Sequence, residues 1–352
     1  MTQKLIAIIL SVMIAVCGCG TAQNSAGSAS GQNTATTAAT AAPGSSETAE
    51  KAASRIAYRY ASRSEGQELM LGNKAYFDGF SRNDLEYKMQ KKGATIEEYK
   101  AHAAEQVLDF TGEEVKAVDA VFAEMEKSLG DNGYTLPPLG EIVLIKTTMQ
   151  EEPGASAYTH GTQIYLSPRL LDFLMADQAN KHVITYMEHV LWHETFHCLT
   201  RCNPDFRAAM YKLIHFTVQE EDFPLPPSAF EYHISNPDVE HHNAYATFRI
   251  NGQDIDCFTD LITTQHFEKE GDLFFACETT ALIPIDGSDM YYTLGQAENF
   301  KEVFGANTAY VIDPEECMAD NFSYALTYGM EGPAGGGYPN PEIIEGIMAL
   351  LK

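Results

Sequence analysis

Two histidines and a glutamate in the middle of the chain have the spacing of a metal site. The segment reads His193-Glu194-x-x-His197. Residues four apart on a helix point in the same direction, so both imidazoles can bind one ion, and zinc readily takes such ligands. Glu194 lies one position round from His193, where its carboxylate can take a proton from a water molecule beside the ion. The pattern therefore predicts a Zn²⁺ site with an adjacent general base.

The flanking residues predict the helix that this site needs. Apolar side chains recur along one face, and no Gly or Pro interrupts residues 181–201. A core helix with two hydrogen-bonded histidines is the alternative interpretation. His189 continues the series of histidines, but on a helix it lies about 12 Å along the axis from His197. We therefore expect His189 to be a structural neighbour of the site and not a ligand.

A third ligand is expected downstream, because catalytic zinc sites usually have three protein ligands. Asp313 and Pro314 have the residue types of a helix start, and Gly329 has that of a helix end. Glu316 and Asp320 are four residues apart, so they share one face of this helix. Glu316 is predicted to bind the metal, while Asp320 accepts the free N–H of a ligating histidine.

Two alternatives remain open for these acids. Asp313 and Glu316 also have the spacing of a capping box, in which Glu316 would bond back to the Asp313 backbone. Glu315 is the rival metal ligand.

The two motifs together resemble the gluzincins, the thermolysin-type zinc metallopeptidases. The resemblance rests on His193-Glu194-x-x-His197 and on Glu316-x-x-x-Asp320. Three stretches also resemble uncharacterised bacterial secreted or lipoprotein zincins, and these are His193 to Asn203, Asn236-Pro237-Asp238 and Pro314 to Phe322. Such proteins often have a histidine where this chain has Asp313, a change at the helix cap. The resemblance covers only these motifs and implies a zincin fold with peptidase chemistry.

The resemblance also implies a residue that stabilises the oxyanion. Zincins often use a Tyr or a His for this purpose, and Tyr310, six residues before Glu316, is the candidate. A core tyrosine near a helix start is the alternative.

The N-terminus has the features of an export signal. Lys4 precedes an apolar run over residues 5–16, which is too short for a membrane-spanning helix. The run ends in Val16-Cys17-Gly18-Cys19, which resembles a bacterial lipobox and implies cleavage before Cys19 and lipid attachment to it. A signal that is cleaved without lipidation is the alternative.

Composition divides the rest of the chain. Residues 20–54 are rich in Ser, Thr, Ala and Gly without apolar periodicity, which indicates a flexible tether. Residues 55–352 are enough for one large catalytic domain. The net charge of −26 makes nucleic acid an improbable partner.

The order of elements predicts an α+β fold. Residues 96–110 and 113–129 have helical periodicity, and residues 141–147 and 162–166 are β-rich. Helices are expected from Ser167-Pro168 and from Asn203-Pro204, and a hairpin is expected around Asn251-Gly252. We expect a zincin-like domain: a small mixed sheet with strand 162–166 at its edge above the His193 helix, followed by a mostly helical lower lobe.

The sequence thus predicts an extracytoplasmic, membrane-anchored zinc metallopeptidase that binds a peptide or protein substrate. The alternative is a non-catalytic lipoprotein with a zincin fold that binds peptides or other ligands.

Overall fold

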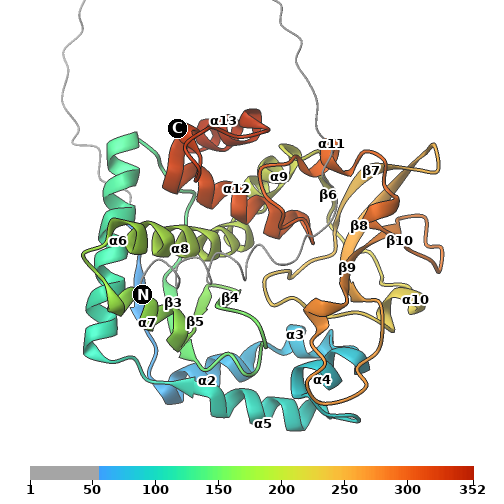
Figure 1. Cartoon of the computed structure of the whole chain (residues 1–352), viewed down its shortest axis with the longest axis horizontal. Helices are drawn as coiled ribbons and strands as arrows, with labels where there is room; N and C mark the ends of the chain where they lie inside the picture. The colour runs from blue at the N-terminus through green and yellow to red at the C-terminus, as the bar shows by residue number, and fades with distance from the viewer. Residues whose placement is uncertain (1–54) are drawn as a thin grey trace, which may run out of the picture. The chain divides into compact units, whose positions relative to one another are not determined.

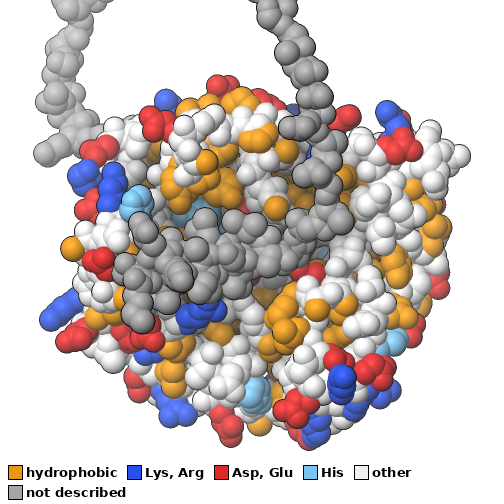
Figure 2. Space-filling view, in the orientation of Figure 1, with side chains coloured by type: hydrophobic (Ala, Val, Ile, Leu, Met, Phe, Trp, Pro, Cys, Tyr) orange, Lys and Arg blue, Asp and Glu red, His pale blue; other side chains and the backbone are white. Residues whose placement is uncertain are grey.

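The computed structural model describes residues 55–352. The predicted signal peptide 1–19, the lipid site Cys19 and the tether 20–54 lie outside the described residues. None of the helices in the described part has the length and hydropathy that a membrane crossing requires. Figure 2 shows acidic and basic side chains interspersed around the visible face of this part. The predicted α+β class is confirmed, with two five-stranded sheets within residues 55–352.

The first sheet is mixed, as predicted, and is buried on both faces. Its strands are, in order, β1 (Tyr58–Tyr60), β3 (Ile142–Thr147), β5 (Gln163–Leu166) and β4 (Ala157–His160), with β2 (Val107–Leu108) also paired to β3. Ile142 and Leu144 belong to the larger core, whereas Val143 and Ile145 face the smaller one. Alternate side chains of a strand point to opposite faces, so a doubly covered strand needs an unbroken apolar run.

The edge of this sheet differs from the prediction. We expected strand 162–166 at the edge, but β5 lies between β3 and β4, and β4 is the edge strand. Gly161, with φ of +56°, turns the chain so that β4 folds back antiparallel on β5. The prediction was wrong because β4, with the sequence Ala-Tyr-Thr-His, lacks the aliphatic residues Ile164 and Leu166 that indicated β5, so β4 was not predicted as a strand.

Helices cover both faces of the first sheet (Figure 1). On the lower side in the figure lie α2 (Arg63–Gly72), α3 (Lys74–Asp78), α4 (Arg82–Met89) and α5 (Ile96–Gln106); on the other side lie α6 (Gly112–Asn132), α7 (Pro168–Ala176) and α8 (Lys181–Cys202). The predicted helices 113–129 and 181–201 are confirmed. The predicted helix 96–110 ends early, at Gln106, because Val107 starts β2 and pairs with Thr147.

The segment after α8 is not the mostly helical lobe that we predicted. Helix α9 (Pro204–Lys212) is followed by an antiparallel sheet with the strand order β10-β9-β8-β7-β6. Its strands are β6 (Thr217–Val218), β7 (Ala244–Ile250), β8 (Gln253–Thr263), β9 (Glu278–Pro284) and β10 (Tyr292–Thr293). The predicted hairpin is confirmed, because Asn251 and Gly252 both have positive φ between β7 and β8. The sheet was missed because the Asn251-Gly252 signal indicates one hairpin only and does not predict the third strand β9, in which residues 278–284 pair with β8.

The C-terminal helices close the larger core. They are α11 (Phe300–Phe304), α12 (Pro314–Tyr328) and α13 (Pro341–Leu350), whereas the short α10 (Pro227–Phe230) packs with β8 and β9 in a separate small cluster. Helix α12 packs along α8, where the ring of Phe322 lies 6.1 Å from Trp192 and 5.2 Å from Phe196. This packing fixes one face of α12 against the histidine face of α8.

Candidate metal centre

Helix α8 presents His193 and His197 on adjacent turns of one face. Asn180 caps the start of the helix, and buried apolar side chains hold it against the core over most of its length. The two imidazole centroids are 4.9 Å apart. His197 is fully buried, whereas the His193 side chain keeps 13% of its surface exposed, so solvent can reach the pair from the His193 side.

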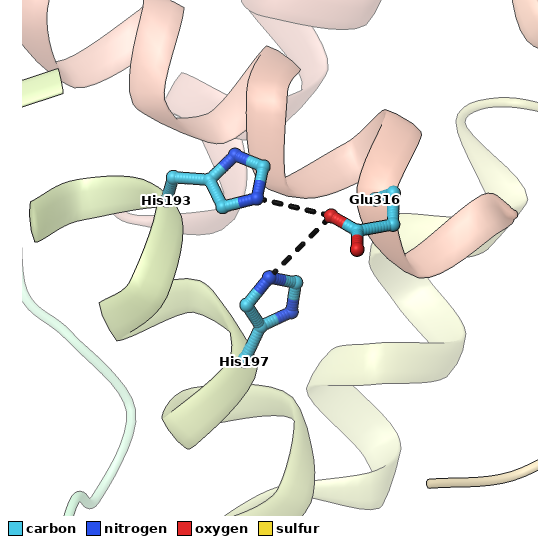
Figure 3. A group of neighbouring side chains, drawn as sticks. All are labelled: His193, His197 and Glu316. Atoms are coloured by element: carbon cyan, nitrogen blue, oxygen red, sulfur yellow. Dashed lines mark hydrogen bonds and ion pairs between the residues drawn. The ribbon is translucent and has the colours of Figure 1, made fainter. Parts of the chain in front are cut away.

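Glu316 of α12 joins the two histidines, although it is 123 positions from His193 in sequence (Figure 3). Its Oε2 atom is 3.0 Å from His193 Nε2 and 3.7 Å from His197 Nε2. Zinc bonds of about 2.0–2.1 Å would place neighbouring ligand atoms of a tetrahedral site roughly 3.3 Å apart. The three predicted ligands therefore converge at separations suited to a single ion.

A buried atom without a partner supports this fit. His197 Nε2 has no hydrogen-bond partner among the residues that the structure describes. A buried polar atom left unpaired costs free energy, and a cation bound to it would remove that cost. Two imidazole nitrogens and a carboxylate oxygen are also a donor set that zinc takes in catalytic sites. The residues present therefore fit a zinc ion.

Asp320 orients the first histidine. Its carboxylate accepts a hydrogen bond from His193 Nδ1 at 3.1 Å and another from the Thr308 hydroxyl. Burial lowers the pKa of His193, but the hydrogen bonds to Asp320 and Glu316 outweigh it and raise that pKa well above the ordinary value. Without a metal, a proton is thus held where the ion would bind, so metal and proton compete for the site.

Glu315 orients the second histidine. Its carboxylate accepts from His197 Nδ1 at 3.0 Å, from the Thr200 hydroxyl at 2.6 Å and from the Tyr211 hydroxyl. Burial raises the pKa of Glu315, but the bond from His197 outweighs it and keeps the pKa below the ordinary value. Glu315 therefore lies on the far side of the ring from Glu316.

The capping alternative for Glu316 does not match the geometry. Asp313 caps α12 by accepting from Glu315 N at 2.7 Å. The second carboxylate oxygen of Glu316 instead accepts from Asn236 Nδ2 at 2.5 Å and from the Tyr310 hydroxyl at 3.4 Å. Tyr310 thus lies at the cluster, and its ring centroid is 6.1 Å from that of His193.

Glu194 is buried beside the two histidines. Its Oε2 atom accepts a hydrogen bond of 2.6 Å from the Thr159 hydroxyl, which belongs to the edge strand β4. Thr159 therefore fixes the carboxylate next to the ligand cluster.

Asp238 is a site residue that the sequence did not assign. One ligand atom from each of Glu194, His197 and Asp238 lies within 4.8 Å of the others. Burial, together with the charge of Glu194, raises the pKa of Asp238 well above the ordinary carboxyl value. The one signal for Asp238 in the sequence was the resemblance of Asn236-Pro237-Asp238 to bacterial zincins, and that resemblance assigned no role to these residues.

His189 lies outside the cluster. Its Nδ1 atom is 2.8 Å from the Ser323 hydroxyl, and its ring stacks on Tyr324 with centroids 5.2 Å apart. These contacts agree with the structural role that we expected for it.

Comparison with protein-family models, with curated proteins and with solved structures gives no match for this chain.

Proposed function

We propose that this chain is a zinc-dependent peptidase whose metal ligands are His193, His197 and Glu316. The observation that carries the proposal is the paired orientation of the histidines. Each Nδ1 atom contacts a carboxylate, that of Asp320 or that of the buried Glu315, and each Nε2 atom faces Glu316. This arrangement directs the Nε2 atoms of both histidines towards one point, as in metal sites where carboxylates bonded to Nδ1 orient the ligating histidines.

Zinc bound at this point would polarise a substrate carbonyl and lower the pKa of a coordinated water to about 7. Glu194 takes the proton from the water that attacks the carbonyl carbon. The same carboxylate then delivers that proton to the amide nitrogen as the C–N bond breaks. The Thr159 hydroxyl keeps the Glu194 carboxylate turned towards the ligands during both transfers.

Tyr310 is proposed to stabilise the negative charge that develops on the carbonyl oxygen. Its hydroxyl already lies at the cluster, 3.4 Å from Glu316 Oε1, and the residue is 40% exposed. The exposed ring leaves the hydroxyl free to turn from Glu316 towards a bound substrate. A hydrogen bond donated to a developing oxyanion stabilises the transition state more than the ground state, so it lowers the barrier to cleavage.

The finer fold assignment is also a proposal. We propose that residues 55–352 form a zincin-like domain. The contact of the edge strand β4 with α8 supports it, since Thr159 meets Glu194 there. We further propose that the chain is exported and anchored to a membrane by lipid on Cys19, so that the peptidase works outside the cytoplasm. The lipobox-like sequence supports this location.

Metal analysis combined with peptide cleavage tests the proposal. The purified chain would be dialysed against Zn²⁺, its metal content measured, and a peptide library analysed by mass spectrometry after incubation. We expect one zinc per chain and new peptide ends that disappear with a chelator and return with added zinc. A zinc-loaded chain that binds peptides without cutting them would contradict the peptidase and favour a binding lipoprotein.

A further inference from the structure

A short loop lies along the edge strand of the first sheet, directly beside the metal ligands. We call residues 236–240 the strap. Thr159 N donates to Asp238 Oδ1 at 2.6 Å, and Gly161 N donates to Glu240 Oε1 at 2.9 Å. The strap therefore accepts hydrogen bonds from the amide of Thr159 in β4 and from the amide of Gly161 in the turn that follows it.

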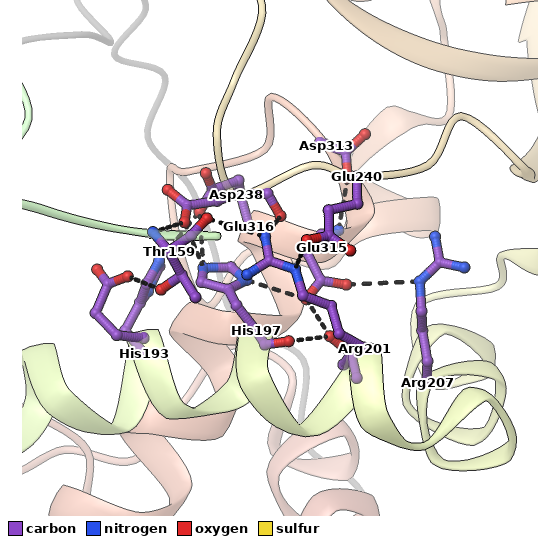
Figure 4. A network of polar contacts seen from close by, with 12 residues as sticks. Thr159, His193, His197, Arg201, Arg207, Asp238, Glu240, Asp313, Glu315 and Glu316 are labelled. Atoms are coloured by element: carbon purple, nitrogen blue, oxygen red, sulfur yellow. Dashed lines mark hydrogen bonds and ion pairs between the residues drawn. The ribbon is translucent and has the colours of Figure 1, made fainter. Parts of the chain in front are cut away.

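Arg201 of α8 fastens the strap to the edge strand (Figure 4). Its guanidinium donates to the backbone oxygens of Thr159 and Gly161 at 3.2 and 3.3 Å. It also donates to the oxygens of Pro237 and Asp238, both at 3.1 Å. One buried arginine thus joins the strand and the strap through their carbonyl groups.

These contacts occupy the groups that an added strand would use. An extended peptide that joins a sheet pairs with outward N–H and C=O groups of the edge strand. At the C-terminal end of β4 these groups belong to Thr159 and, in the turn that follows, to Gly161, and side chains bond the N–H and C=O of both residues. A peptide can therefore pair with this part of β4 only after the strap has moved.

The strap also brings a carboxylate to the metal centre. Asp238 Oδ1 is 4.0 Å from His197 Nε2, the atom that has no hydrogen-bond partner among the described residues. The separation exceeds the roughly 3.3 Å of a tetrahedral ligand pair by less than 1 Å. A small shift of one side chain would complete the coordination.

Charge gives a second reason for a cation at this place. Asp238, Glu194 and Glu316 are all buried, with exposed fractions of 8, 4 and 1%. Buried carboxylates of like charge are costly unless positive charge compensates them. Arg201 directs its hydrogen bonds and its ion pair at the backbone of β4, of the turn after it and of the strap and at the Glu240 side chain, so among these three carboxylates its charge acts on Asp238 only without a hydrogen bond or ion pair.

The strap borders an open cavity. A cavity of about 430 Å³ is lined by Asp238, Val239 and Glu240, together with residues of α8 and α9. The strap forms part of its wall, so a displaced strap can enter space that is already open.

We infer that Asp238 is a fourth, displaceable protein ligand of the metal, delivered by a strap that occupies the substrate edge of β4 in the resting protein. The inference rests on the proposed metal site. It adds a ligand, and it makes strap release a step that precedes cleavage of an extended peptide.

The test compares Asp238→Asn with Asp222→Asn in the Co²⁺- and Zn²⁺-loaded chain. Asparagine keeps an oxygen for the Thr159 amide but is a poor zinc ligand. Asp222 is an exposed acid that pairs with His241 and serves as the control. Loss of a nearby charge weakens zinc binding whether or not Asp238 is a ligand, so affinity from chelator competition is not decisive alone. The visible spectrum of bound Co²⁺ reports the ligands directly.

We expect Asp238→Asn to shift the cobalt bands and to weaken zinc binding by about tenfold or more, with both properties unchanged in Asp222→Asn. An Asp238→Asn protein that folds like the parent and gives the parent's cobalt spectrum would overturn the inference. Neither the cobalt spectrum nor the zinc affinity depends on cleavage. Failure of this inference can therefore be told apart from failure of the proposed function, which would be a metal-loaded parent that cuts no peptide.

Discussion

Two adjacent glutamates at the start of α12 have different tasks at the metal centre. Glu316 points between the histidine Nε2 atoms, while Glu315 holds Nδ1 of His197 from the other side. The sequence left these two residues as rivals for one role, because neighbouring helix positions differ by about 100° in direction and both lie near a buried face. The structure gives each a separate contact.

Substitution of each glutamate should therefore give a different result. Glu316→Ala should abolish stoichiometric zinc binding, because it removes a proposed ligand. Glu315→Gln keeps hydrogen-bonding atoms beside His197 and should weaken zinc binding by about 10–100-fold, the usual cost of changing an outer partner of a ligand. Chelator competition on both purified variants measures the difference. Zinc retained by Glu316→Ala but lost by Glu315→Gln would assign the ligand to the other glutamate.

At the scale of elements, the sequence predicted the helices that have an extended apolar periodicity or typical start and end residues. Helix α8 was predicted from an uninterrupted apolar face, and α12 from Asp313, Pro314 and Gly329. The meeting of Glu316 with α8 was predicted only through the two motifs. Apolar packing between Phe322 and Phe196 is what brings these helices together.

The parts that the sequence missed depend on contacts between distant segments. Strand β4 was missed because it is short and defined by its pairing with β5. Asp238 was not assigned because its proximity to His197 follows from Arg201, which binds Pro237 O and Asp238 O across the fold. Such a long-range hydrogen bond cannot be predicted from a local pattern of residues.

Loosening the strap should speed cleavage. Glu240→Ala removes the acceptor of Gly161 N and the 3.0 Å ion pair with Arg201. A partly exposed pair is worth roughly 0.2–1 kcal/mol, so kcat/KM for an extended peptide should rise by about 1.4-fold to fivefold at unchanged zinc content. Glu221→Ala is the control, since this glutamate is exposed and is not one of the strap residues. Slower or equal cleavage by Glu240→Ala would show that the strap does not restrict access.

At the scale of the whole molecule, stability is linked to pH through a buried histidine. Burial lowers the pKa of His189 from 6.5 to about 4. Because the folded-state pKa lies below the unfolded value, the unfolded chain takes up the proton first. Stability is therefore fully present above about pH 6.5 and is lost as the pH falls towards 4.

Replacement of this histidine should flatten the pH dependence. His189→Gln cannot take up the proton, although it loses the stacking on Tyr324 and should be less stable than the parent at neutral pH. Between about pH 7 and pH 4, the parent should lose about 2–3 kcal/mol more unfolding free energy than the variant. Urea unfolding of both metal-free proteins measures this difference. Parallel pH profiles would contradict the burial of a neutral His189.

Hydrolysis by Glu194→Gln is the most direct test of the account. Glutamine fills the same volume and can still accept the Thr159 hydroxyl bond, but it cannot take a proton from water. We predict that the variant binds as much zinc as the parent and that its kcat for peptide cleavage falls by about two or more orders of magnitude. A variant that holds zinc and cuts peptides at the parental rate would contradict the proposed role of this centre.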